Sequence, residues 1–102
     1  MIHPLLDPNS THYDTQEKPT IYYIEEKLTI AEMIGVCKFH QMKYDMREKG
    51  QNDLDIQKIQ RYTNYMHFLT KCMRNYRHAN KTSCRQVIDT LYPKLSYNAK
   101  DN

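Results

Sequence analysis

Apolar side chains recur with helical spacing over much of the second half of the chain. Between residues 56 and 76 they follow one another at intervals of three or four, at Ile56, Ile59, Tyr62, Met66, Leu69, Met73 and Tyr76. Because 3.6 residues complete one turn of an α-helix, this spacing places them on one helical face. The pattern therefore predicts a long amphipathic helix of about six turns.

A second helix is predicted just before it. Thr29-Ile30-Ala31-Glu32 has the capping-box form, in which a Thr hydroxyl and a Glu carboxylate satisfy backbone donors at a helix start. The helix is expected over residues 30–49, with a buried stripe at Ile30, Met33, Ile34, Cys37, Gln41 and Tyr44 and a stop at Gly50. A short turn containing Asn52 and Asp53, either of which can cap the next helix, predicts an antiparallel helix pair.

Shorter elements flank this pair. Residues 21–28 are expected to form a helix, although the run Ile-Tyr-Tyr-Ile also suits a strand. Ser83 begins another capping box, ahead of a short helix that Pro93 ends. The sequence thus predicts a mainly α-helical small bundle, with an extended proline-rich arm over residues 1–19, a single helical domain over residues 20–93 and a flexible tail over residues 94–102.

The composition favours one small domain that works as an oligomer in a reducing compartment. The chain has 102 residues, 39% of them hydrophobic, which suffices for one core. It contains no long apolar run and no signal-peptide pattern at its start, so we expect no membrane segment and a cytoplasmic protein. Three cysteines without a close pair suit reduced thiols. Nine tyrosines predict rings at the rim of the core or in an interface, and hence a homo-oligomer.

The sequence also excludes some chemistry. With two glycines it has neither a phosphate-binding P-loop nor a Rossmann turn. Cys37 and His40 stand one helical turn apart, which is half of a zinc site, but no companion pair has metal-ligand spacing, and we expect no structural metal. Asp53 and Asp55 can supply carboxylates to Mg²⁺, or cap the long helix and favour its dipole.

Cationic side chains gather on both sides of the predicted turn. They are Lys38, Lys43, Arg47, Lys49, Lys58 and Arg61, with Tyr44, Tyr62 and Tyr65 among them. Lys and Arg bind phosphate oxygens and Tyr can stack on a base, which suits a nucleotide. The alternative is a solvated charged face with tyrosines in the core. A separate basic block from Lys71 to Arg85 predicts nucleic-acid binding as a less favoured function.

The order of these residues resembles a family of small bacteriophage proteins. Its pattern reads His-Tyr, then Lys-Tyr-x-x-Arg, then Asp-Leu-x-Lys-x-x-x-Tyr, and the likeness spans about residues 12–69. The matching positions are His12, Tyr13, Lys43, Tyr44, Arg47, Asp55, Lys58 and Tyr62. The family includes a coliphage early nucleotide kinase that acts on deoxynucleoside monophosphates. This chain has Phe39-His40 where the family has Gly-Asn, and Met46 where the family usually has an aromatic residue.

The resemblance implies nucleotide handling in the cytoplasm of an infected bacterial host. Our hypothesis is a phage-type nucleotide-binding protein that acts as a nucleoside monophosphate kinase on ATP with Mg²⁺ and without a P-loop. Its nucleotide-binding residues would be His12, Tyr13, Lys43, Tyr44, Arg47, Lys58 and Tyr62, and its catalytic residues Asp55, Arg47 and Lys43. The alternative is a non-enzymatic effector of host takeover that inhibits a host protein or sequesters a nucleotide signal.

Overall fold

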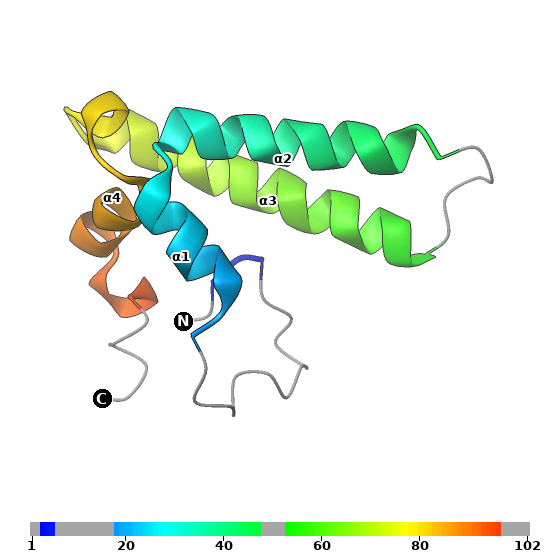
Figure 1. Ribbon diagram of the computed structural model, residues 1–102, viewed down its shortest axis with the longest axis horizontal. Coiled ribbons are helices and arrows are strands. Elements are labelled where there is room, and N and C mark those ends of the chain that lie inside the picture. Colours follow the sequence, from blue (N-terminus) through cyan, green and yellow to red (C-terminus); the bar gives the residue numbers. More distant parts are fainter. Residues whose placement is uncertain (1–2, 6–17, 48–52, 97–102) are drawn as a thin grey trace.

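The structure, a computed structural model, describes residues 3–5, 18–47 and 53–96 and is mainly helical (Figure 1). Its elements are α1 (Thr20–Lys27), α2 (Ile30–Asp45), α3 (Asp53–Asn75), the 3₁₀ turn η2 (Ala79–Lys81), α4 (Cys84–Leu91) and the 3₁₀ turn η3 (Pro93–Leu95). The predicted mainly α-helical class is confirmed. The ambiguous segment near residues 21–28 is a helix.

Side-chain caps start α2 and α4, as the predicted capping box at Thr29 and as a single hydrogen bond at Ser83. The Thr29 hydroxyl accepts the backbone N–H of Glu32 at 3.3 Å, and the Glu32 carboxylate accepts the backbone N–H of Thr29 at 2.9 Å. The Ser83 hydroxyl accepts the backbone N–H of Gln86 at 3.2 Å. α2 ends earlier than predicted, at Asp45 with Met46 as its C-cap, and the turn over residues 48–52, including Gly50, lies outside the described residues.

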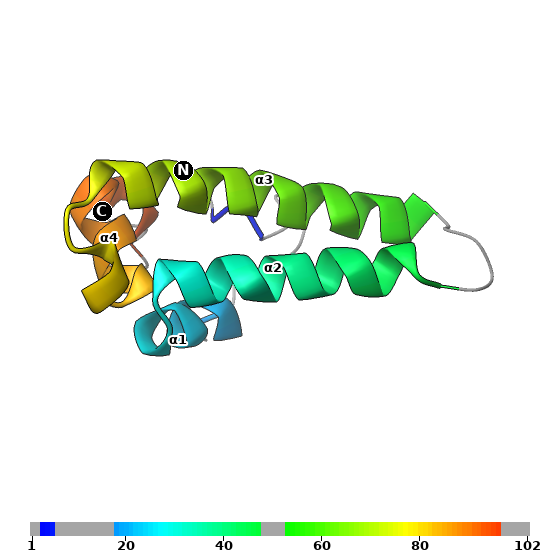
Figure 2. The ribbon, with the colours of Figure 1, turned by 90° about the horizontal axis from the view of Figure 1, so that it is seen from above.

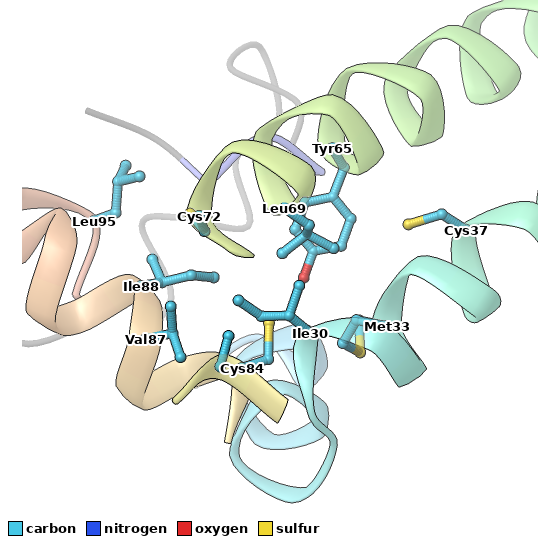
Figure 3. Close-up of a cluster of buried hydrophobic side chains, with 11 residues drawn as sticks. Ile30, Met33, Cys37, Tyr65, Leu69, Cys72, Cys84, Val87, Ile88 and Leu95 are labelled. Carbon is cyan, nitrogen blue, oxygen red and sulfur yellow. The ribbon is translucent and has the colours of Figure 1, made fainter. Parts of the chain in front are cut away.

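The helices α2 and α3 lie side by side along their length, and α1 and α4 pack near the end where α2 begins and α3 finishes (Figures 1 and 2). The hydrophobic core lies at this end (Figure 3). It consists of Ile30, Met33, Cys37, Tyr65, Leu69, Cys72, Ala79, Cys84, Val87, Ile88 and Leu95. The other half of the α2–α3 pair, which we call the distal half, extends beyond this core.

The predicted buried face of α3 is confirmed in part, because Tyr62, Met66 and Tyr76 pack against the core as expected. Leu69 is fully buried as expected, but Ile56 and Met73 are 48% and 37% exposed. Two further positions, Tyr65 and Cys72, are also fully buried in the core. The hydroxyl of Tyr65 is hydrogen-bonded to the buried carboxylate of Glu25 on α1. Hydrophobic spacing alone could not show that Tyr65 would be buried while Ile56 stays exposed.

Most of the predicted arm (residues 1–19) and tail (residues 94–102) lies outside the described residues, but the described parts of both segments contribute buried side chains. His3 is 2% exposed and Leu5 packs against the core cluster. Leu95 is 3% exposed. Short segments that carry one anchoring side chain can dock even where prolines or a helix end disfavour regular structure.

Candidate functional site

The interior of the distal half is polar and aromatic. Its half-buried Gln41 donates a hydrogen bond from Nε2 to Oγ1 of Thr63 at 2.6 Å, and Thr63 in turn donates to the carbonyl of Ile59 at 2.8 Å. The imidazole of His40 stacks on the ring of Tyr62, with centroids 4.5 Å apart and planes 11° apart. Polar groups that bond to one another can hold two helices together without an aliphatic core.

Three cations from both helices gather around one buried ring in this half. Tyr44 is 7% exposed. Its centroid lies 5.5 Å from Nζ of Lys43, 5.1 Å from Cζ of Arg47 and 5.3 Å from Nζ of Lys58. The negative face of an aromatic ring attracts cations at this range. Tyr44 therefore acts as a platform that draws three positive groups together against their mutual repulsion.

One carboxylate completes this group, which we call the cationic pole (Lys43, Tyr44, Arg47, Asp55 and Lys58). Oδ1 of Asp55 lies 3.4 Å from Nη1 of Arg47, and the Asp55 side chain is 4% exposed whereas that of Arg47 is 45% exposed. Asp55 thus holds the guanidinium from the buried side, while the other side of Arg47 stays in water. Within these five residues, three cations accompany one carboxylate.

The stacked pair beside the pole is held in neutral forms. The pKa of His40 is lowered from 6.5 by burial and, to a smaller extent, by the charge of Lys43. The pKa of Tyr62 is raised by burial, with Tyr44 adding to the effect. Nδ1 of His40 is buried and has no hydrogen-bond partner within the described residues. Because His40 lies close to Lys43, protonation of its imidazole would add to the positive charge of the pole.

The structure brings five of the predicted site residues together, namely the five of the cationic pole. Tyr62 lies next to them through His40, whose ring centroid is 6.4 Å from that of Tyr44. The predicted residues His12 and Tyr13 and the side chain of Asp53 lie outside the described part of the chain. The predicted stacking of a base on Tyr44 would have to displace cations, because these cover the ring.

No protein-family model, curated protein or solved structure matches this chain. The likeness to small phage proteins therefore rests on the matching residues alone. None of the helices in the described part of the chain has the length and apolar character of a membrane-spanning segment. Among the same residues, no three His, Cys, Asp or Glu side chains are grouped as metal ligands would be.

A second polar cluster, which the sequence did not indicate, lies inside the molecule near the core. Glu25 on α1 is fully buried, and its carboxylate accepts hydrogen bonds from Nη1 of Arg85 at 2.8 Å, from Nε2 of His3 at 2.8 Å and from the hydroxyl of Tyr65. We call these four residues the buried network. They come from the N-terminal segment, α1, α3 and α4, so the network ties together four parts of the chain.

Hydrogen bonding defines the proton positions in this network. The backbone N–H of Leu5 donates to Nδ1 of His3 at 3.1 Å, so Nδ1 carries no proton and Nε2 is the donor to Glu25. The pKa of Tyr65 is raised far above its usual value, first by burial and then by the charge of Glu25. The network therefore pairs one carboxylate with one guanidinium and two neutral donors.

Arg85 completes its own hydrogen bonds within the protein. Its Nε donates to Oδ1 of Asp89 at 2.9 Å and its Nη2 to the carbonyl of Leu95 at 3.1 Å, while its Cζ lies 4.9 Å from the ring centroid of Tyr22. Arg85 is 5% exposed. The predicted basic block therefore keeps its exposed cations Lys71, Arg74, Arg77 and Lys81 but loses Arg85, because a desolvated guanidinium cannot contact a nucleic-acid phosphate.

The three cysteines are buried free thiols. Burial raises the pKa of both Cys37 and Cys72 to about 11. Because the thiolate is the reactive form, these positions are unsuited to nucleophilic chemistry at neutral pH. Cys37 packs in the core, which agrees with a structural use of the Cys37 and His40 pair.

Proposed function

We propose that this protein binds the phosphate groups of a nucleotide at the cationic pole. The observation that carries the proposal is the convergence of Lys43, Arg47 and Lys58 on one buried ring, each within 5.5 Å of its centroid. No two of these charges can lie further apart than twice that distance, which suits the oxygens of one or two phosphate groups. Charge-assisted hydrogen bonds of this kind are short and about twice as strong as neutral ones.

The geometry of the pole requires the helices to run in opposite directions, and the contacts support this. Gln41 pairs with Thr63, His40 with Tyr62, and Arg47 with Asp55, so residue numbers rise on α2 as they fall on α3. Such an antiparallel pair places the last turn of α2 beside the first turns of α3. The Lys-Tyr-x-x-Arg and Asp-x-x-Lys halves of the phage motif then form one site.

Binding is supported more directly than phosphoryl transfer. A kinase needs a group to orient the acceptor hydroxyl and carboxylates for Mg²⁺. Asp55 is the candidate for both roles, and it is 3% exposed and ion-paired with Arg47. A nucleotide that drew Arg47 onto its phosphate would release this carboxylate, so transfer to a deoxynucleoside monophosphate stays our second proposal. Sequestration of a nucleotide without turnover needs no such rearrangement.

Calorimetric titration with deoxynucleoside monophosphates and with ATP tests the binding proposal. Removing one charge-assisted contact costs about 1.5–3 kcal/mol, so Lys43→Ala, Arg47→Ala and Lys58→Ala should each weaken binding roughly tenfold to a hundredfold. Lys38→Ala on α2 and Lys71→Ala on α3 are matched controls, since both residues are exposed and belong to the same helices. They should leave the affinity nearly unchanged.

Incubation with labelled ATP and the same monophosphates separates the two forms of the proposal. A kinase would be supported if the wild-type chain transfers the labelled phosphoryl group and Asp55→Asn loses this transfer but still binds nucleotide. Heat released on binding without transfer would support sequestration. If no nucleotide binds, or if the pole variants and the controls lose affinity equally, the pole is not a nucleotide site.

A further inference from the structure

The outer face of α2 is apolar along its whole length. Opposite the side that packs on α3, the exposed positions form a row at intervals of three or four residues, and we call this row the outer stripe. It consists of Ala31, Gly35, Phe39, Met42 and Met46. Phe39, Met42 and Met46 are 60%, 57% and 78% exposed. The stripe spans sixteen positions, from Ala31 to the C-cap residue Met46, and its fifteen steps correspond to about 22 Å along the helix.

Within the described part of the chain, the large side chains of this stripe stay exposed. A helix that is apolar on both sides is normally buried on both, and exposed large side chains in a continuous row mark an interaction surface. The proposed nucleotide site uses none of the five stripe residues, although Lys43 of the cationic pole lies on one flank of the stripe. The stripe therefore needs a partner that supplies a second apolar helix face.

We propose that the partner is a second copy of this chain, with two α2 helices packed antiparallel about a two-fold axis near Phe39. In that arrangement Ala31 of one copy faces Met46 of the partner subunit, and Gly35 faces Met42 of the partner subunit. The small residues of one half of the stripe thus receive the long side chains of the other half. A Cβ built on Gly35 meets nothing within 4 Å, so the space above it is open.

Charges beside the stripe agree with the same arrangement. Glu32 and Lys43 are both exposed and lie on one flank of the stripe, since eleven residues make close to three turns. Around the two-fold axis, Glu32 of one copy comes within two positions of the place that faces Lys43 of the partner subunit, and this happens twice. The capping bonds to Thr29 use Oε1 of Glu32, so Oε2 is the oxygen that would face the lysine. Lys38 lies on the opposite flank next to the axis and close to Lys38 of the partner subunit. Its stem can cover apolar surface only while its ammonium group points into water, away from that like charge.

The size of the stripe sets the expected strength of the dimer. A stripe of about 22 Å on a helix about 10 Å wide gives a footprint of roughly 220 Å², which is small beside the ~800 Å² per partner of a standard interface. The dimer should therefore dissociate reversibly on dilution. Its contacts are dominated by one aromatic and two methionine side chains per copy, so a single substitution among them should have a large effect.

Sedimentation equilibrium over a concentration series tests the proposal. The full chain should show a reversible monomer–dimer equilibrium, and Phe39→Asp should raise the dissociation constant by at least about tenfold. Gly35→Leu should also weaken the dimer, because the added side chain occupies the space for the partner's Met42 while meeting nothing in its own chain. Met73→Asp on α3 is the matched control, an exposed methionine away from the stripe. Circular dichroism should show every variant folded.

Cysteine cross-linking tests the direction of packing. Ala31→Cys and Met46→Cys should each give little cross-link alone but a strong one when the two variants are mixed, because the antiparallel register brings these two positions together. The native thiols interfere little, since they are buried. A chain that stays monomeric at all concentrations, or dimers that survive both Phe39→Asp and Gly35→Leu, would overturn the proposal. So would cross-linking at identical positions, which indicates parallel helices.

Discussion

The buried network and the cationic pole use the same kinds of side chain in opposite ways. Each combines a carboxylate, at least one cation and a tyrosine, contributed by different helices. In the buried network Glu25 is fully buried and bonded to three donors. In the cationic pole Arg47 is nearly half exposed, and the cations outnumber the carboxylate.

This difference separates a structural cluster from a site for a ligand. A desolvated carboxylate that already has its partners offers nothing to a ligand, and its value lies in fixing which segments pack together. Cations that share one ring and face water retain the capacity to bind an anion. Proximity of charged groups is thus insufficient to mark a binding site. The groups must also be exposed to solvent and must have hydrogen-bonding capacity that the protein does not already use.

The largest predicted effect tests the structural half of this comparison. Glu25→Gln should destabilise the fold by about 3–5 kcal/mol, because it leaves the buried guanidinium of Arg85 without its carboxylate partner on α1. Glu26→Gln is the matched control, since Glu26 is adjacent, exposed and, among the described residues, paired with Lys18 alone at 2.5 Å. Urea unfolding measures both. Equal, small losses for the two variants would show that the network does not hold the fold together.

A smaller loss is expected for Tyr65→Phe, which removes only one hydroxyl donor to Glu25. A hydrogen bond to a charged group contributes about 1.5–3 kcal/mol, and the ring that fills the core is kept. Tyr62→Phe provides the comparison, because its ring stacks on His40 in the distal half. Urea unfolding of the two variants should show the greater loss for Tyr65. The reverse order would place the stabilising hydroxyl outside the buried network.

The contrast also explains how much the sequence could predict. The fold class and the caps at Thr29 and Ser83 follow from local signals, which act within one turn of helix. The cationic pole was predictable because its residues flank one short turn, so chain connectivity alone brings them together. The buried network joins positions 3, 25, 65 and 85, and no local pattern relates residues so far apart. Two adjacent acids, Glu25 and Glu26, follow the apolar run Ile21–Ile24, and the sequence alone does not show which of them is buried.

Removing the carboxylate of the cationic pole should strengthen anion binding, whereas removing the carboxylate of the buried network should weaken the fold. Asp55→Asn takes away the negative charge that lies 3.4 Å from Arg47, so phosphate affinity should rise, by roughly fivefold if the pair contributes up to about 1 kcal/mol. Asp89→Asn removes a carboxylate that is also paired with an arginine, but on α4, and should leave affinity unchanged. Calorimetry with inorganic phosphate measures the change. Weaker binding in Asp55→Asn would mean that Asp55 supports the ligand more than it competes with it.

The smallest effect concerns the pH dependence of His40, where stability and binding should change in opposite directions. Burial and the charge of Lys43 lower the pKa of His40 from 6.5, so the unfolded chain takes up this proton at a higher pH than the folded chain. The stability that neutral His40 contributes is therefore complete above about pH 6.5 and is lost as the pH falls through the folded pKa. The same protonation adds a positive charge beside Lys43, so affinity for sulfate, which stays doubly charged in this range, should rise as stability falls.

Urea unfolding and sulfate titration across this range measure the two quantities. In His40→Asn both trends should flatten relative to the wild-type chain, whereas His67→Asn on the exposed face of α3 should keep them. If sulfate affinity and stability fall together in acid, protonation of His40 does not strengthen anion binding at the cationic pole. The affinity of the pole then depends on its lysines and arginine alone.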